Sequence, residues 1–186
     1  TIERHADRLT FLIEDLLTIS RLESGQMVIN LGTIELRPAV ARVLEDLSTR
    51  AAARQAMLAN EVPEMLHASA DPERLHQVLA NLVDNAIIHG RVGGTVRIGA
   101  QPLTDHAVEI WVQDDGAGIP PEACARVFER FYRADKARSR EGGGTGLGLA
   151  IVKHLVLAHG GEVRVEGGLG RGAKFAFTLR RAACSG

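Results

Sequence analysis

The chain has 186 residues, 45% of them hydrophobic, which is enough for one medium-sized domain plus a smaller piece. Its formal net charge of −1 gives no reason to expect binding to nucleic acid or, for the chain itself, to a membrane surface. The two cysteines lack metal-ligand spacing and predict a reducing, cytoplasmic setting, and no apolar run approaches the ~20 residues that span a bilayer.

Residues 1–25 are predicted to form one long helix. Its apolar residues recur at heptad spacing and include Ile2, Leu9, Leu12, Leu16 and Ile19. Such spacing predicts a seam for packing against another helix. We expect the partner to be a helix from an upstream segment or from a second subunit. The alternative is that this helix packs on the domain that follows it.

The rest of the chain alternates between helical and extended patterns. Helices are predicted at 38–54 and 71–87 and again after residue 148. The predicted strands are 57–62, 66–70, 95–101, 107–113, 162–166 and 174–180. The strands at 95–101 and 107–113 are predicted to form a hairpin, because only a short turn separates them. Interspersed helices and strands predict an α/β fold in which a mixed sheet carries its helices on one face.

A glycine-rich loop, Gly-Gly-Gly-Thr-Gly-Leu-Gly-Leu at 142–149, leads directly into a strongly apolar helix. Its backbone amides carry little side-chain bulk, and the helix N-terminus adds unpaired amides and the positive end of the dipole. The stretch therefore predicts an anion site, with phosphate as the expected anion. No Lys follows a glycine, so it does not match the P-loop spacing. The alternative is a surface loop capped by a helix.

Asn81 and Asn85 lie one turn apart on an otherwise apolar helix and share a face. An amide oxygen is a hard, neutral ligand that suits Mg²⁺ already carrying nucleotide phosphates. The alternative is a pair of buried amides that cap neighbouring backbone.

Asp114 ends a predicted strand and is followed by Asp115, Gly116, Ala117 and Gly118. An ionised carboxylate only accepts hydrogen bonds, so it can select an amino group such as the exocyclic amine of adenine. Glycines beside it would let a flat ring approach the backbone. The alternative is an ordinary Asp-Gly turn.

Six basic residues lie between Arg126 and Arg140, directly before the glycine loop. They are either solvated surface or a lid over phosphate, and Phe128, Phe131 and Tyr132 would anchor such a lid.

Four stretches, in this order, resemble the N, G1, F and G2 boxes of sensor histidine kinases: 81–86, 114–119, 128–133 and 144–149. Residues 170–175 resemble the final glycine box. Residues 8–25 resemble the end of the dimerisation hairpin in the phosphate-sensor-like branch. The resemblance implies a Bergerat-type two-layer sandwich, shared with gyrase and heat-shock-chaperone ATPases. Residues 1–25 would be the second hairpin helix and 26–183 the ATP-binding domain.

The resemblance also assigns site residues. Asn85 would ligate Mg²⁺, with Asn81 in the same nucleotide site, and Asp114 would bind the adenine amine. Gly116 and Gly118 would line the base pocket, and Arg133 would reach the phosphates from the lid. Backbone amides for the phosphates would come from Gly144, Thr145, Gly146, Leu147 and Gly148. Ile88 departs from the family, which often has Lys or Arg at this position.

The implied enzyme moves the γ-phosphoryl of Mg-ATP to a histidine and then to an aspartate on a response-regulator receiver domain. It would be a homodimer through the helical hairpin and would meet a membrane only through upstream segments. The acceptor motif His-Glu-x-Arg-Thr-Pro is absent from the chain, and His5 matches it only in having Arg three residues later. The acceptor is therefore expected upstream. The alternative is a nucleotide-binding interaction module with little or no catalysis. A hydrolytic ATPase is disfavoured because Asn81 stands where its catalytic glutamate is expected, and an amide cannot take a proton from water.

Overall fold

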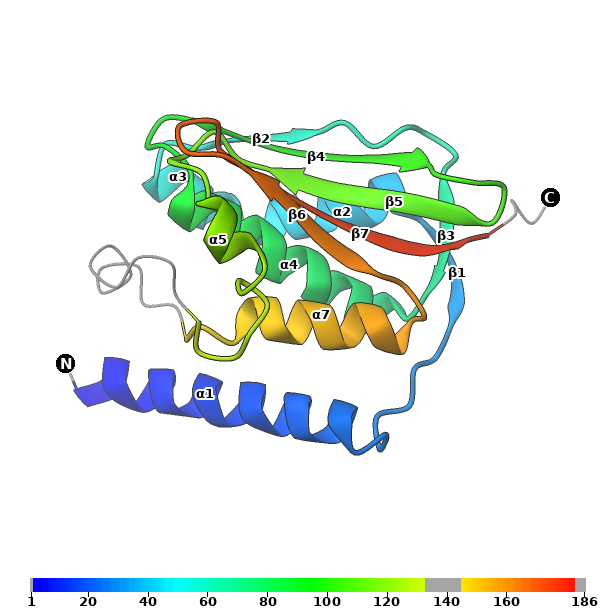
Figure 1. Cartoon of the computed structure of the whole chain (residues 1–186), viewed down its shortest axis with the longest axis horizontal. Coiled ribbons are helices and arrows are strands. Elements are labelled where there is room, and N and C mark those ends of the chain that lie inside the picture. Colours follow the sequence, from blue (N-terminus) through cyan, green and yellow to red (C-terminus); the bar gives the residue numbers. More distant parts are fainter. Residues whose placement is uncertain (1, 133–144, 183–186) are drawn as a thin grey trace.

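The structure is a computed structural model that describes residues 2–132 and 145–182, with the backbone alone for residues 2–8 and 11. A twisted sheet forms one layer, and helices cover one of its faces (Figure 1). The long first helix, α1 (Ile2–Glu23), lies beyond that helical layer, alongside the last helix. This is the mixed α/β sandwich with helices on one face that the alternating pattern predicts.

The sheet has seven strands in the order β1-β3-β7-β5-β4-β2, and β6 also pairs with β7. The strands are β1 (Gly32–Glu35), β2 (Met57–Asn60), β3 (His67–Ala70), β4 (Thr95–Pro102), β5 (Ala107–Gln113), β6 (Val163–Gly167) and β7 (Ala173–Arg181). β2 pairs with β4 in parallel, and the other pairings of the described sheet are antiparallel. The predicted hairpin of β4 and β5 is confirmed.

The helical layer contains α2 (Leu36–Asp46), α3 (Ser48–Ala53), α4 (Pro72–His89) and α7 (Gly148–Ala158). A short helix, α5 (Pro121–Cys124), follows β5. The side chain of Asp71 accepts hydrogen bonds from the amides of Glu73 at 3.0 Å and Arg74 at 3.2 Å, so it caps α4. The single helix predicted at 38–54 is wrong in one respect, because it breaks at Leu47 into α2 and α3.

The core lies between the sheet and α4 and α7. On β5, Val108, Ile110 and Val112 are buried, and they alternate with Glu109 and Trp111 on the opposite face. The same period-two pattern on the neighbouring strands gives the sheet one apolar face. Burial of that face against the helices is the main source of stability. It also fixes the end of β5, where the candidate site begins.

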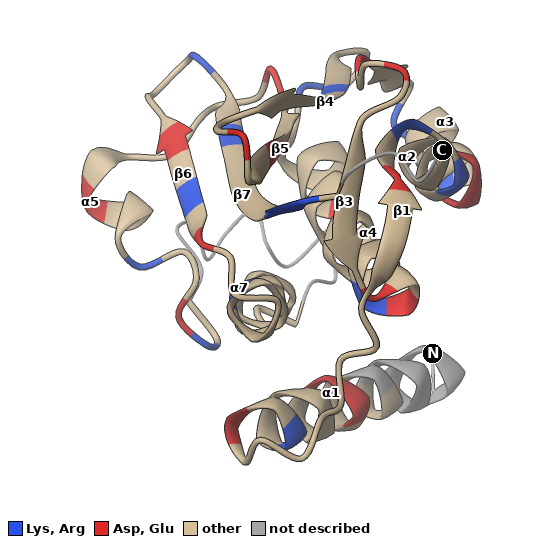
Figure 2. Cartoon of the chain, turned by 90° about the vertical axis from the view of Figure 1, so that its right-hand side faces the viewer, with Lys and Arg blue, Asp and Glu red and all other residues tan. Residues whose placement is uncertain are grey.

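Helix α1 packs on α7 through only part of its apolar seam. Leu12, Ile19 and Leu22 join the core, and Ile19 is 1% exposed. Figure 2 shows α7 end-on between α1 and the sheet. Part of the seam therefore packs on the helix's own domain, as the alternative interpretation of the sequence predicts, and not on a helix from an upstream segment or a second subunit. A second set, Leu9, Ile13, Leu16 and Leu17, stays exposed, and we call it the outer α1 face.

Candidate functional site

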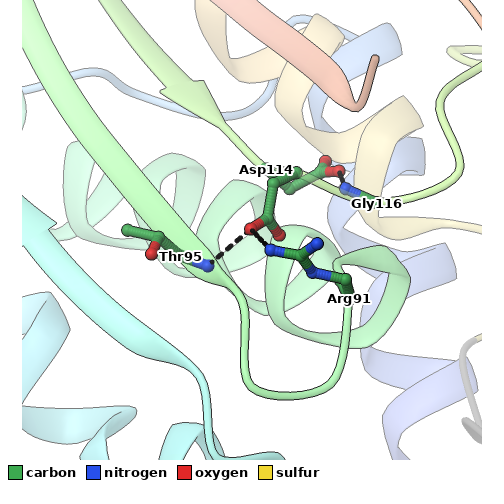
Figure 3. A network of polar contacts seen from close by, with 5 residues as sticks. Arg91, Thr95, Asp114 and Gly116 are labelled. Carbon is green, nitrogen blue, oxygen red and sulfur yellow. Dashed lines mark hydrogen bonds and ion pairs between the residues drawn. The ribbon is translucent and has the colours of Figure 1, made fainter. Parts of the chain in front are cut away.

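Asp114 is a buried carboxylate at the end of β5. It is only 4% exposed, and its backbone amide donates to the carbonyl of Ala173 on β7 at 2.9 Å. Its Oδ1 accepts the amide of Gly116 at 2.8 Å (Figure 3). Among the described residues, the backbone amide of Ala173 is the only other group that stabilises this carboxylate, and it does so more weakly than Gly116, so Oδ2 can still accept a hydrogen bond. Burial raises the pKa of Asp114, the bonds from Gly116 and Ala173 lower it, and the nearby charge of Asp115 raises it.

Two glycines let the loop after Asp114 press against neighbouring backbone. A Cβ on Gly116 would clash with the carbonyl oxygen of His89 at the end of α4. Gly118 has a φ of +79°, and a Cβ there would clash with the carbonyl oxygen of Gly168. The amide of Gly172 donates to the carbonyl of Gly116 at 3.1 Å, which ties the loops together. These glycines are therefore required by the protein's own packing, whatever ring lies beside them.

The second acid of the pair, Asp115, has a different task. Its Oδ2 accepts the amide of Thr95 at 3.0 Å and lies 3.4 Å from Nη2 of Arg91. These contacts hold the connection between α4 and β4 against the end of β5. The two adjacent acids thus have different roles: Asp115 binds groups of the protein, whereas Asp114 is buried and can still accept a hydrogen bond at Oδ2.

Asn81 and Asn85 lie on α4, one turn apart. Nδ2 of Asn81 makes a long hydrogen bond, 3.4 Å, to the carbonyl of Gly148 at the start of α7, and its amide oxygen accepts no hydrogen bond from the described residues. Asn85 is half-buried and makes no hydrogen bond to any residue that the structure describes. Helix α4 thus brings Asn81 to the start of α7, where the glycine loop ends, and carries Asn85 one turn further along.

The described part of the glycine loop begins at Thr145. Its hydroxyl oxygen accepts the amide of Leu147 at 3.3 Å, and the carbonyl of Gly146 accepts the amide of Phe131 at 3.0 Å. Leu147 is fully buried and immediately precedes α7, which has no side-chain cap among the described residues. The first amides of α7 are therefore open to an anion.

The remaining predicted phosphate contacts, Arg133 and Gly144, lie with the rest of 133–144 outside the described residues. The predicted aromatic anchor is correct for Phe128, whose ring packs edge-on against Phe175 with centroids 6.0 Å apart. It is wrong for Phe131, which is 57% exposed. Phe131 has a φ of +59°, so the backbone turns there and directs the ring away from the core.

A metal ion at this site would need ligands from outside the protein. The described residues contain no group of three or more His, Cys, Asp or Glu side chains placed to hold one. A single amide such as that of Asn85 suits Mg²⁺ that takes its other ligands from phosphate and water. The donor set therefore fits a nucleotide-borne ion better than a free one.

Sequence reasoning missed the contribution of α1. The Thr145 hydroxyl donates to Oδ2 of Asp15 on α1 at 3.2 Å. At the C-terminal end of the helix, Glu23 forms an ion pair with Arg130, and Nε2 of His154 lies 3.7 Å from Oε1 of Glu23. An acidic residue on a helix carries no local signal of such a distant partner.

Comparison with known proteins decides the family. Residues 70–183 match the sequence model of a family described as the histidine kinase-, DNA gyrase B- and HSP90-like ATPases. The chain belongs to this ATPase family. The predicted Bergerat-type fold and the resemblance to sensor histidine kinases are thereby confirmed.

Named relatives of this ATPase domain include two bacterial sensor kinases. The sensor-like histidine kinase SenX3 of Mycobacterium tuberculosis is 38% identical over 174 residues, which cover 94% of this chain and 42% of the relative. The sensor histidine kinase WalK of Bacillus subtilis is 33% identical over 178 residues, which cover 95% of this chain and 29% of WalK. The chain thus spans less than half the length of these relatives.

Solved structures of histidine kinases are also similar to this chain. Full-length ShkA in complex with AMPPNP is 34% identical with a TM-score of 0.86, covering 97% of this chain and 37% of that one. The histidine kinase AdeS of Acinetobacter baumannii is 25% identical with a TM-score of 0.80, and the match covers 96% of this chain and 81% of the AdeS chain. Within the described residues, no helix of this ATPase domain is both long and apolar enough to cross a membrane.

Proposed function

We propose that this chain binds Mg-ATP and donates the γ-phosphoryl group to a histidine that lies upstream of Thr1 in a longer protein. From there the group would pass to an aspartate on a response-regulator receiver domain. The chain would thus be the ATP-binding part of a sensor histidine kinase. The observation that carries this proposal is the buried Asp114 carboxylate, which is oriented by Gly116 and can still accept a hydrogen bond at Oδ2.

Asp114 suits adenine recognition because its Oδ2 can accept the exocyclic amine of the base. Guanine presents a carbonyl oxygen at the equivalent position, and two acceptors in a buried site would repel each other. Gly116 holds the other carboxylate oxygen at 2.8 Å, so the orientation of the carboxylate is fixed before the ligand arrives. Preorganisation of this kind lowers the entropic cost of binding.

The phosphates would lie between α4 and the start of α7. Asn85 would ligate Mg²⁺, with the Asn81 oxygen close by, and the amides from Thr145 to Gly148 would face the phosphate oxygens. Phosphoryl transfer depends mainly on positioning and on charge stabilisation, and the donor domain need not supply a nucleophile. A site of amides, a metal ion and helix N-terminal charge fits that requirement.

The same proposal covers the organisation of the longer protein. Residues 1–25 would be the second helix of a dimerisation hairpin and 26–183 the catalytic domain. The outer α1 face supports a homodimer, because four exposed apolar residues on one side of a helix need a partner helix. We place the chain in the cytoplasm, with any membrane anchor in a segment upstream of it.

Phosphohistidine formation in the longer protein tests the proposal. The protein that includes the segment upstream of Thr1 is incubated with γ-labelled ATP and Mg²⁺. We expect label that is stable to base, labile to acid and absent in the Asn85→Ala variant. Binding of ATP without any such label would instead favour the interaction module with little or no catalysis.

A further inference from the structure

The contacts of helix α1 with the described residues include one apolar strip and two polar points. Leu12, Ile19 and Leu22 pack towards α7, which lies alongside α1 in Figure 1. One polar point is the pairing of Glu23 with Arg130 and His154 near the helix C-terminus. The other is the hydrogen bond between Asp15 and Thr145, which joins residues 130 positions apart.

The contact at Asp15 reaches the proposed phosphate end of the nucleotide site. The amide of Leu147 donates to the Thr145 hydroxyl oxygen at 3.3 Å, and that hydroxyl donates to Asp15 at 3.2 Å. The two bonds form a chain from the first residue before α7 to the carboxylate of α1. Burial raises the pKa of Asp15, the bond from Thr145 lowers it, and Glu14 raises it. The carboxylate is thus partly removed from water, which would screen its charge.

We propose that docking of α1 and binding of a polyphosphate oppose each other at Thr145. The inference rests on the nucleotide-binding function proposed above. In the docked arrangement Asp15 accepts a hydrogen bond from the hydroxyl of Thr145. It also adds a negative charge next to the phosphate end of the site. A nucleotide therefore binds more weakly while α1 is docked, and its binding loosens α1 in turn, because coupling between two equilibria is reciprocal.

Two physical effects give the coupling its sign. A hydroxyl has a single proton, so the Thr145 hydroxyl cannot donate to Asp15 and to a phosphate oxygen at the same time. A carboxylate and a polyphosphate also repel each other, and the repulsion grows with the charge on the ligand. The penalty should therefore rise from adenosine to ADP to ATP. An effect on general packing of the site would change all three affinities equally.

Affinity measurements across this ligand series test the proposal. Asp15→Asn removes the charge but keeps an acceptor for Thr145, so α1 remains able to dock. The matched control is Glu14→Gln, which removes the same charge at an exposed neighbouring position. Binding of AMPPNP, ADP and adenosine is measured by calorimetry in Mg²⁺ buffer for the wild type and both variants.

We expect Asp15→Asn to tighten AMPPNP roughly tenfold, to tighten ADP less and to leave adenosine within about twofold. Glu14→Gln should change no affinity by more than about twofold, since exposed charges are screened. Equal AMPPNP affinity in wild type and Asp15→Asn would overturn the inference, as would equal tightening of all three ligands. Failure of AMPPNP and adenosine to bind any of these proteins would instead remove the proposed function, and the inference with it.

Hydrogen exchange tests the reciprocal effect. In the wild type, AMPPNP should speed amide exchange in α1 around residues 12–22, because bound phosphate releases the helix from α7. Adenosine, which carries no phosphate, should leave that exchange unchanged. Exchange in α1 that is unchanged or slowed by AMPPNP would contradict the coupling.

Discussion

The backbone amide of Gly116 donates to Oδ1 of Asp114 at 2.8 Å, and this bond orients a carboxylate that is only 4% exposed. Burying a carboxylate in this way lowers the free energy of unfolding, because the charged group loses its contact with water. Its ionised form has left water, yet among the described residues it is stabilised only by the backbone amide of Gly116 and, more weakly, that of Ala173. Such a cost is expected where a ligand completes the hydrogen bonding.

We predict that Asp114→Asn stabilises the unliganded protein at neutral pH. Burial raises the pKa of Asp114 above its ordinary value of 3.8, so the folded state binds the proton more tightly than the unfolded state. The aspartate is therefore most favourable below pH 3.8, and its contribution is lost as the pH rises through the raised pKa. Asparagine stays neutral and keeps the acceptor for Gly116. The Tm of the variant should exceed that of the wild type at about pH 7, and the difference should shrink towards about pH 4. A lower Tm for the variant at neutral pH would contradict this account.

Gly116→Ala should destabilise the fold by about 1–3 kcal/mol, the usual cost of overpacking. The added Cβ would clash with the backbone carbonyl of His89, which cannot move aside as a flexible side chain could. Gly32→Ala is the matched control, because a Cβ at that position meets no atom within 4 Å. Urea denaturation of the two variants gives the comparison. If both variants unfold at the same midpoint, the loop at Gly116 is not tightly packed in solution.

Much of the fold follows from local chemistry that the sequence displays. Asp71 and Pro72 fix the start of α4, since one side chain caps the helix and the other is preset for its first turn. The alternating pattern of β4 and β5 places both strands and their turn correctly. The glycine and asparagine boxes identify the domain because they occur in a fixed order, which no single motif could do.

Features set by distant contacts could not be predicted in the same way. The parallel pairing of β2 with β4 depends on the whole sheet, because neither strand carries a signal for its neighbour. The heptad seam of α1 indicates a helical partner but does not distinguish α7 from a second subunit, and the structure divides the seam between a buried strip and the outer α1 face. The bond from Thr145 to Asp15 joins residues 130 apart, and an aspartate on a helix would be expected in water.

Asn85→Ala should weaken binding of AMPPNP roughly tenfold in Mg²⁺ buffer, because the variant loses the one side chain proposed to ligate the ion. In EDTA the same variant should bind the nucleotide almost as the wild type does. The comparison of the two buffers separates a metal ligand from a residue that merely supports α4. Equal weakening in both buffers would assign Asn85 a structural role instead.

The chain by itself should not become phosphorylated. Its sequence has no acceptor motif, and His5 matches that motif only in having Arg three residues later. Incubation with γ-labelled ATP should therefore leave no acid-labile label on the protein. Label that appears on the wild type and disappears in His5→Gln would overturn this prediction and make His5 the acceptor.

The most direct test of the central claim is a calorimetric titration of Mg-AMPPNP into the wild type, Asp114→Asn and Asp115→Asn. Asp114→Asn replaces an acceptor by a donor that faces the adenine amine, which should cost about 2–3 kcal/mol, or roughly 30- to 150-fold in affinity. Asp115→Asn makes the same chemical change one residue away and keeps an acceptor for the amide of Thr95, so it should bind within a few-fold of the wild type. Equal affinity of the wild type and Asp114→Asn would contradict the claim that Asp114 recognises the base of ATP.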